Sequence, residues 1–255
     1  MPDVGSRLSC RALLAGVVLA LFAGGPAAAL SILLNDGATG GNVQARLVGL
    51  GHAVTVAPPA TWTAAFDYSV FDVVAFEFSV PAGSANPADI GHLVAAVDAG
   101  EVGVVFFRGY GAAATAAALG VSASASDSAM WFQNPALLTV HDNSHAITAG
   151  MSLGTQDLGF EYIARIDQPG VDTDVLASGP QGAALVVHQT RRVVVAPFFG
   201  HPTDFAGETQ MSVDLTERAL QWAASSPVDL GESGALGLFG LGLVGVGVAM
   251  RRRLS

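Results

Sequence analysis

The stretch EVGVVFFRGYGAAATAAALG, residues 101–120, combines a strand, a tight turn and a helix. Residues 102–107 form a continuous apolar run, which is typical of a strand buried on both faces. Two glycines follow, with Tyr110 between them. Residues 112–119 have high helix propensity, and Gly120 is a natural helix end. A strand, a Gly-x-Gly turn and a helix form the geometry in which many α/β hydrolytic enzymes hold a nucleophile, but here that place is taken by a tyrosine.

Residues 1–29 have the layout of a secretory signal peptide. Arg7 and Arg11 precede an apolar run at residues 12–23, and Ala27-Ala28-Ala29 offers a small-residue cleavage site. The run is shorter than the roughly 20 apolar residues that span a bilayer, which disfavours a permanent anchor. We therefore expect an exported protein that resides in the periplasm or at the cell surface.

The C-terminal part divides into a linker, residues 225–233, and an apolar segment with a basic end, residues 234–255. Residues 234–250 carry no charge, and Arg251-Arg252-Arg253 follows at once. As a helix of about 1.5 Å per residue, the apolar stretch covers roughly 25 Å. This pattern predicts a short transmembrane anchor whose arginines stay in the cytoplasm. A buried core helix is the alternative, and the absence of a polar face disfavours it.

The tail ESGALGLFGLGLVGVGVAMRRR, residues 232–253, resembles the PEP-CTERM type of protein-sorting signal of Gram-negative bacteria. The resemblance implies attachment to the membrane through the C-terminal helix and a sorting protease, an exosortase, as a partner. Where the family has Pro-Glu-Pro, this chain has Gly231-Glu232-Ser233, so only Glu232 matches the signature. The resemblance therefore lies in the three-part layout of the tail, and whether the tail is cleaved stays open.

One domain, residues 30–224, lies between these ends and has a normal single-domain size. From Leu30 to Leu230, nineteen acidic residues face six arginines, a difference of −13, and the chain has no lysine. Such a surface repels nucleic acid and anionic lipid head groups, so no nucleic-acid partner is expected. The only cysteine, Cys10, lies in the predicted signal peptide. The mature domain therefore has no disulfide, no thiolate metal site and no cysteine nucleophile.

Strands and helices are predicted to alternate through the first half of this domain. The expected strands are residues 30–34, 53–57, 72–76 and 102–107, and the expected helices are residues 42–50, 87–99 with Asn86 as cap, and 112–119. In the second half we expect strands at residues 137–141, 171–177, 183–189 and 193–199, and a closing helix at residues 212–224. Alternating strands and helices imply right-handed crossovers. We therefore expect an α/β three-layer sandwich with a mostly parallel central sheet.

Three places resemble the class I glutamine amidotransferase-like fold, which is flavodoxin-like, and most closely its trehalose-utilisation (ThuA-like) group. They are ILLNDGATGGNVQARLVGLGHAVTV at residues 32–56, SHAITAGM at residues 144–151, and RRVVVAPFFGHPTDF at residues 191–205 with LTERALQWAA at residues 215–224. The likeness covers residues 30–224. It implies this fold for the domain, while the function has to be argued from the site.

Amidotransferase-type catalysis needs a thiolate, a histidine that accepts its proton and a carboxylate that orients the histidine. Tyr110 occupies the nucleophile position, and a phenol with a pKa of about 10 is a poor acyl acceptor at neutral pH. We therefore expect a catalytically degenerate domain that serves in binding or surface structure, with extracellular polysaccharide as a candidate partner. The alternative is a ThuA-like hydrolase or carbohydrate-processing enzyme that uses His201 and Asp204, with His145 as a further candidate.

Open α/β sheets bind their ligands in the crevice at the carboxyl ends of the strands. Asp36, Glu77, Arg108 and Tyr110 follow predicted strands and are therefore the candidate ligand-binding residues. The loop that contains Asp36 precedes a helix and could hold an anion there, although its carboxylate opposes phosphate. Glu77 and Arg108 could bind a polar ligand or pair with each other.

His141, Asp142 and His145 form an H-D-x-x-H pattern, which on a helix would place two histidines on one face, as in zinc sites. The strand predicted before His141 and the polar residues after it favour a turn, with Asp142 or Ser144 as its cap. We therefore predict no metal site and no cofactor, and a structural role for His145. Of the other histidines, His52 and His92 are expected near solvent and His188 in a strand.

Overall fold

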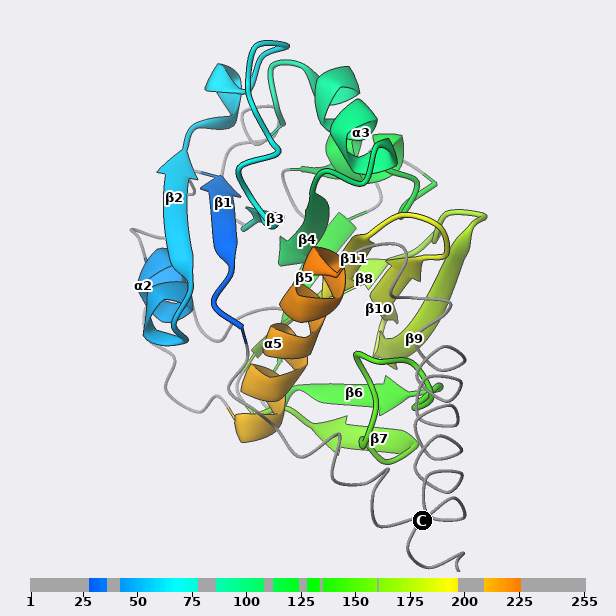
Figure 1. The fold of residues 1–255 in the computed structure, drawn as a ribbon. Helices are drawn as coiled ribbons and strands as arrows, with labels where there is room; N and C mark the ends of the chain where they lie inside the picture. Colours follow the sequence, from blue (N-terminus) through cyan, green and yellow to red (C-terminus); the bar gives the residue numbers. More distant parts are fainter. Residues whose placement is uncertain are drawn as a thin grey trace, which may run out of the picture.

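The computed structural model describes residues 28–35, 42–77, 86–107, 112–123, 128–133, 135–159, 161–196 and 209–225. Figure 1 shows how these parts of the chain are arranged. In chain order the elements are β1 (Ser31–Asn35), α2 (Asn42–Gly49), β2 (Ala53–Ala57), the 3₁₀-helix η1 (Pro59–Thr61), β3 (Val73–Phe76), α3 (Ile90–Asp98), β4 (Gly103–Phe107), α4 (Ala113–Ala118), β5 (Ser128–Gln133), β6 (Leu137–Val140), β7 (Gly154–Asp157), β8 (Glu161–Ile166), β9 (Thr173–Gly179), β10 (Gly182–His188), β11 (Val193–Ala196) and α5 (Gln210–Ala224).

The predicted signal peptide and C-terminal segment lie almost wholly outside the described residues. The described chain begins at residue 28 and ends at residue 225. Among the helices in between, none combines the length and apolarity needed to cross a membrane. The two predicted end segments therefore stay predictions.

The strands of the described chain form one mixed sheet. Its main order is β2-β1-β3-β4-β11-β10-β9-β6-β7, with β8 beside β10 and β5 beside β8. The five strands from β2 to β11 are parallel. Every described pairing beyond β11 is antiparallel. The expectation of a mostly parallel sheet therefore holds for one half only, and the links from β9 to β10 and from β10 to β11 are too short for a crossover helix.

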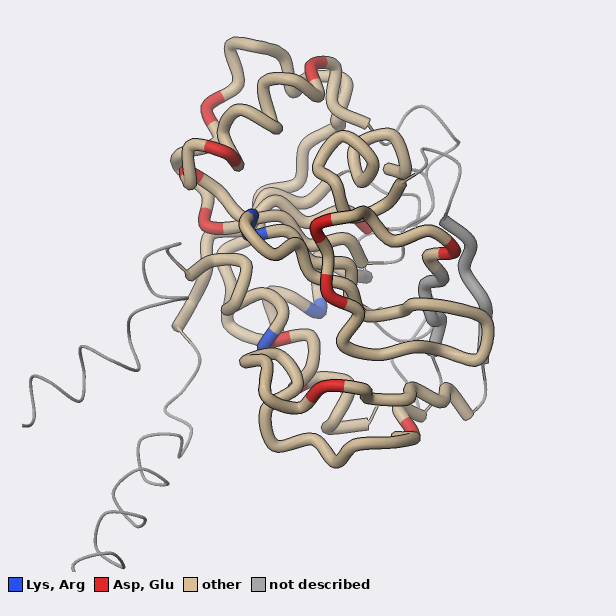
Figure 2. Tube along the Cα trace, turned by 90° about the vertical axis from the view of Figure 1, so that its right-hand side faces the viewer, with Lys and Arg blue, Asp and Glu red and all other residues tan. Residues whose placement is uncertain are grey.

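Charged residues are sparse on the described chain. Figure 2 shows acidic residues spread over the described chain, with basic residues at a few places. The whole chain has a formal net charge of −10 at pH 7.

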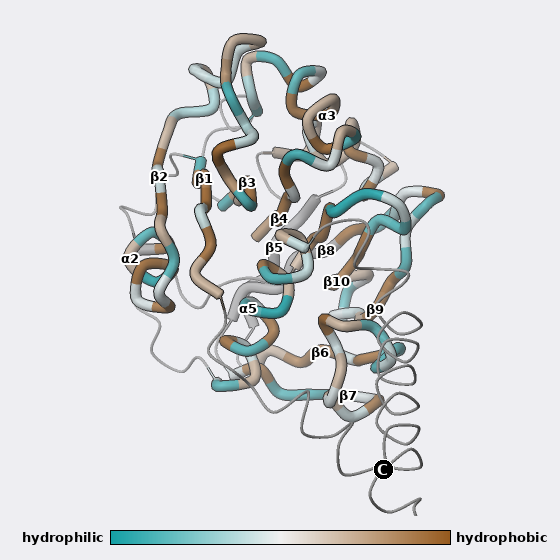
Figure 3. Tube along the Cα trace, viewed as in Figure 1, coloured by the Kyte–Doolittle hydropathy of each residue, from teal (hydrophilic) through white to brown (hydrophobic). Residues whose placement is uncertain are grey.

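The central strands are apolar because both faces of the parallel half are covered. β3, β4 and β11 are buried along their whole length. Val105 and Phe107 belong to a core that includes residues of α2 and α5. Val104 and Phe106 belong to a second core with residues of α3 and α4. Figure 3 shows the matching hydropathy, with apolar colour along the central strands and alternating colour along α5.

The C-terminal end of α5 packs tightly on the amino end of β4. A Cβ atom at Gly103 would stand 1.9 Å from the carbonyl oxygen of Ala223. The buried guanidinium of Arg192 donates to the carbonyl oxygens of Ala223 at 3.1 Å and Ala224 at 2.9 Å, and also to Gly100. A positive group is favourable at this end because the carbonyls there carry the negative end of the helix dipole. Burial lowers the pKa of Arg192 from its usual value.

The helix predicted at residues 87–99 begins later than expected. Asp89 is the N-cap of α3, and its carboxylate accepts a hydrogen bond from the backbone N–H of His92 at 2.9 Å. Asn86, the predicted cap, instead accepts from the backbone N–H of Thr115 at 3.1 Å and from its hydroxyl at 2.8 Å. Asn86 therefore connects the segment before α3 to α4, and the closer carboxylate takes the capping position.

The expectation that His52 and His92 lie near solvent is wrong. His52 is buried: its Nδ1 accepts from the backbone N–H of Leu30 at 3.2 Å, and its Nε2 lies 3.0 Å from a carboxylate oxygen of Glu217. His92 is half-buried, and its Nε2 lies 2.8 Å from the carbonyl oxygen of Phe66. Both rings satisfy backbone groups from distant segments, which side-chain polarity in the sequence cannot reveal.

Candidate functional site

The parallel half of the sheet has its topological switch point between β1 and β3. The chain leaves β1, forms β2 on one side and then returns to β3 on the other side. Asn35 ends β1 and is fully buried, and Glu77, 4% exposed, follows β3. The Asn35 Oδ1 accepts from the backbone N–H of Glu77 at 2.6 Å, and its Nδ2 donates to the Glu77 carbonyl oxygen at 3.3 Å. The two strand ends are thereby fixed where ligands of such sheets usually bind.

Most of the residues predicted for this crevice cannot be placed. Asp36, Arg108 and Tyr110, and the catalytic candidates His201 and Asp204, lie outside the described residues. Of the ligand-binding candidates, Glu77 alone falls in the described part. Glu77 directly follows β3, and its role as a ligand-binding residue stays a prediction.

His145 lies in the turn after β6, against α5. Its Nδ1 accepts from the backbone N–H of Ile147 at 3.2 Å, and its ring centroid is 5.4 Å from that of Trp222. Burial lowers the pKa of His145. Trp222 adjoins Ala223, which packs on the amino end of β4. His145 therefore lies toward the opposite end of the parallel strands from Glu77, and the structure does not bring the two together.

The H-D-x-x-H segment forms a turn rather than a helix. The Asp142 carboxylate accepts from the backbone N–H and the hydroxyl of Ser144, both at 2.7 Å, and these bonds lower its pKa. The Nε2 of His141 lies 2.9 Å from the hydroxyl of Ser178. The prediction that Asp142 caps a turn is confirmed. Within the described ranges, no group of three or more His, Cys, Asp or Glu side chains is placed to hold a metal ion.

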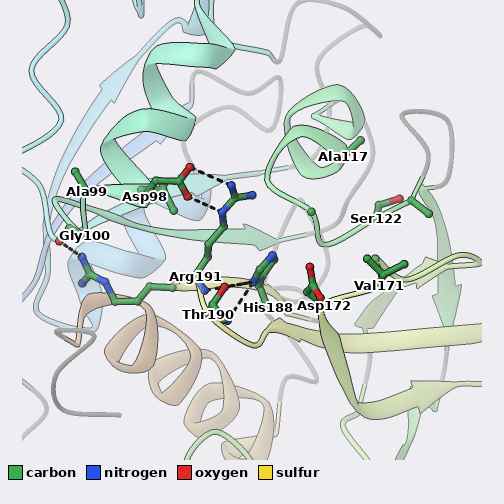
Figure 4. A pocket seen from close by; sticks show the side chains of 15 residues that line it. Asp98, Ala99, Gly100, Ala117, Ser122, Val171, Asp172, His188, Thr190 and Arg191 are labelled. Atoms are coloured by element: carbon green, nitrogen blue, oxygen red, sulfur yellow. Dashed lines mark hydrogen bonds and ion pairs between the residues drawn. The ribbon is translucent and has the colours of Figure 1, made fainter. Parts of the chain in front are cut away.

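A cavity of about 800 Å³ lies at the opposite end of the parallel strands from Glu77, beside the amino ends of β4 and β11 (Figure 4). We call it the amino-edge cavity. Its walls come from the end of α3, the end of α4, residues 170–172 and the turn between β10 and β11. The charged and polar side chains that line it are those of Asp98, Ser122, Asp172, His188, Thr190 and Arg191, with Arg192 at its base.

Arg191 and Asp98 form a two-pronged ion pair across this cavity. The Arg191 Nε lies 2.6 Å from Oδ1 of Asp98, and its Nη2 lies 3.0 Å from Oδ2. Such fork-like pairs fix orientation as well as adding energy. The pair ties the β10–β11 turn to the C-terminal end of α3, so the wall has a defined shape (Figure 4).

His188 presents one ring nitrogen to the protein and the other to the cavity. It is 6% exposed, and its Nδ1 accepts from the backbone N–H groups of Thr190 at 3.2 Å and Arg191 at 3.3 Å. A ring whose Nδ1 accepts carries its proton on Nε2 when neutral. Burial lowers the pKa of His188, the charge of Arg191 lowers it further, and Asp172 and Asp98 act in the opposite direction. His188 is therefore a neutral Nε2–H donor at pH 7.

Gly120 packs closely against these two side chains. Its φ of +82° is one that residues with side chains rarely adopt. A Cβ atom there would stand 3.0 Å from His188 Nε2 and 3.6 Å from Arg191 Nη1. Glycine at the end of α4 therefore serves both the left-handed turn and the close approach of the His188 ring.

The sequence does not point to this cavity. His188 reads as a strand residue, and Arg191-Arg192 reads as a turn between two strands. One signal was available: this short turn holds two of the six arginines between Leu30 and Leu230. The strand pattern instead points to the carboxyl ends of the parallel strands, where ligands of this class of sheet usually bind.

Solved structures with a similar fold include two that cover most of this chain. A ThuA-like protein of Parabacteroides merdae ATCC 43184 is similar with a TM-score of 0.57 and 16% identity, covering 78% of this chain and 91% of that chain. A GMP synthase-type protein of Thermoplasma acidophilum is similar with a TM-score of 0.50 and 15% identity, covering 77% and 95%. No family model and no curated protein sequence matches. At these identities the comparison concerns the fold, which is α/β and like that of ThuA-like and glutamine amidotransferase-like proteins.

Proposed function

We propose that this protein is an exported binding protein, held at the cell envelope by its C-terminal helix, whose amidotransferase-like domain has lost the amidotransferase reaction. The observation that supports it most is the combination of this fold with a chain whose only cysteine is Cys10. The thiolate chemistry of amidotransferases needs a cysteine at the turn after β4. This chain has Tyr110 there instead.

The geometry at the switch point also favours binding or structure over catalysis. Glu77 is almost fully buried and its main chain is held on both sides by Asn35. A general base has to come within hydrogen-bond reach of its substrate. A carboxyl group with so little exposure is better suited to support the crevice than to react in it.

Export accounts for the two end segments, and the start of the domain is compatible with it. Cleavage after Ala29 would make the amine of Leu30 the new N-terminus. That nitrogen already lies 3.2 Å from Nδ1 of the buried His52, whose other nitrogen lies 3.0 Å from Glu217. A new positive charge at Leu30 would therefore meet an acceptor and a nearby carboxylate. Proposed partners are the membrane, a sorting protease and extracellular polysaccharide.

Cell fractionation with mass spectrometry tests this proposal. The full chain, produced in a Gram-negative host, is expected in the envelope fraction with Leu30 as its first residue. A variant without residues 234–255 should move to the soluble periplasm or medium, while one without residues 1–29 should stay in the cytoplasm. Full-length chain with residues 1–29 intact in the cytoplasm would contradict export.

A ThuA-like hydrolase is the second candidate, because His201 and Asp204 follow β11 in the sequence and a ThuA-like protein shares the fold. The test is turnover of a panel of amides, esters and glycosides by the full chain. If catalysis is the function, His201→Ala should lower the rate by at least ~10²-fold, as expected for loss of a general base. If binding is the function, no substrate in the panel is consumed, and ligand affinity is nearly the same in the variant.

A further inference from the structure

We propose that the amino-edge cavity binds a neutral, hydroxyl-rich ligand, such as one or two sugar units. The inference rests on the proposed function as a binding protein, and adds to it a site and a ligand class. The site is at the opposite end of the parallel strands from Glu77. The argument uses His188, Arg191, Asp98, Asp172 and Gly120.

Two N–H donors converge beside Gly120. His188 Nε2 and Arg191 Nη1 lie 3.0 Å and 3.6 Å from the same point, the place of a Cβ atom on Gly120. In the part of the chain that the structure describes, neither nitrogen has a hydrogen-bond partner, because His188 bonds through Nδ1 and Arg191 through Nε and Nη2. His188 is 6% exposed, and buried donors are usually satisfied. A ligand oxygen in the cavity in front of Gly120 can accept from either donor.

Acceptors lie close to these donors. Figure 4 shows the carboxylate of Asp172 beside the ring of His188, and the carboxylate of Asp98 on the far side of Arg191. A hydroxyl group accepts and donates at once, so one hydroxyl can accept from His188 and donate to Asp172. A neighbouring hydroxyl can use Arg191 and Asp98 in the same way. Donors next to carboxylates therefore match adjacent hydroxyls better than they match a group that only accepts.

The charge and the size of the amino-edge cavity narrow the class of ligand further. Arg191 and Asp98 neutralise each other and Arg192 is committed to the end of α5, so Asp172 is the carboxylate of the described lining that no arginine pairs with. With the net charge of −10 of the chain, this disfavours phosphate and other anions. The protonated Nε2 of His188 and the guanidinium of Arg191 disfavour a metal ion or an organic cation. A volume of about 800 Å³ lies within the usual range for small-molecule pockets.

The test is ligand titration of the detergent-solubilised full chain by calorimetry and saturation-transfer NMR. The probes are glucose, galactose, mannose, N-acetylglucosamine and maltose, with inorganic phosphate as the anionic probe. We expect saturable binding of at least one sugar and none of phosphate. Asp172→Asn should weaken sugar binding at least about tenfold, the loss expected for one hydrogen bond to a charged group. Asp174→Asn, which changes an exposed carboxylate outside the cavity, should leave the affinity unchanged.

His188→Gln provides a second variant, with its melting temperature measured first to establish that it folds. Glutamine keeps an N–H donor, so His188→Phe, which has a ring of similar shape and no donor, should lose sugar affinity more than His188→Gln does. The proposal is overturned if none of the sugars binds, if phosphate binds more tightly than any sugar, or if Asp172→Asn and Asp174→Asn bind alike. These results are independent of cell fractionation, so an exported protein can fail this test, and a protein that is not exported can pass it.

Discussion

The Asn35 side chain is bonded to both main-chain groups of Glu77, with Oδ1 2.6 Å from the amide nitrogen and Nδ2 3.3 Å from the carbonyl oxygen. The backbone pairing of β1 and β3 ends just before, at Leu34 and Ala75. The amide side chain therefore continues the ladder past the last strand pair. Buried backbone groups must find partners, so a side chain with one acceptor and two donors is well suited to this place.

Asn35→Ala is expected to destabilise the protein by about 1–3 kcal/mol, because it leaves buried backbone groups of Glu77 without partners. Urea unfolding followed by circular dichroism measures the change. Asn143→Ala is the matched control: its amide donates to the carbonyl of Met151 from an exposed position, and water can replace it. Equal losses in both variants would contradict the role assigned to Asn35.

Gly103→Ala should destabilise strongly, by several kcal/mol, or prevent folding. The new Cβ would stand 1.9 Å from the Ala223 carbonyl oxygen, so β4 and α5 must move apart in a well-packed core. Gly49→Ala is the control, because no atom lies within 4 Å of its Cβ position in α2. There alanine should be neutral or stabilise by up to about 1 kcal/mol. Thermal melts of both variants are enough, and an unchanged melt for Gly103→Ala would show that this contact is not close.

The sequence predicts the parallel half of the fold far better than the rest. Residues 53–57 are predicted as a strand and form β2 with the same bounds, and the run at residues 102–107 forms β4 within one residue. These strands are apolar runs between turn residues, which is a strong local signal. The sequence pattern predicts no strand at the positions of β5, β7 and β8. β7 is the short polar stretch GTQD, and its strand conformation depends on pairing with β6, which no local pattern records.

The candidate site was predictable in part for a similar reason. Glu77 could be placed at the carboxyl end of a strand, because the apolar run at residues 72–76 ends just before it. The amino-edge cavity could not, since it depends on four segments that are separated in sequence: the ends of α3 and α4, residues 170–172 and the β10–β11 turn. Its key contact, Arg191 with Asp98, joins residues 93 positions apart.

Arg192→Met is expected to cost about 2–4 kcal/mol, because carbonyl groups of Gly100, Ala223 and Ala224 lose their donor inside the protein. Methionine keeps much of the side-chain length and removes the charge. Arg218→Met is the control, as the Arg218 guanidinium donates to Ala149 from an exposed position, where water can substitute. Chemical denaturation of both variants gives the comparison. A larger loss in Arg218→Met would contradict the importance of the α5 cap.

Stability should fall as the pH is lowered from 7.5 to 5.5. Burial lowers the pKa values of His188 and His145 in the folded protein below the ordinary value of 6.5. Above that value both rings are neutral in the folded and unfolded chains, so they contribute no pH dependence. Below it, the unfolded chain takes up protons that the folded chain does not, which favours unfolding.

For His188 the structural reason is clear: protonation of Nδ1 would remove the acceptor for the N–H groups of Thr190 and Arg191 and add a charge beside the Arg191 guanidinium. Asp172 and Asp98 only partly offset this effect. Free energies of unfolding from urea titrations at pH 7.5, 6.5 and 5.5 give the slope, and His188→Gln should reduce it. A flat profile, or the same slope in that variant, would mean that His188 accepts a proton in the folded protein as readily as in the unfolded chain.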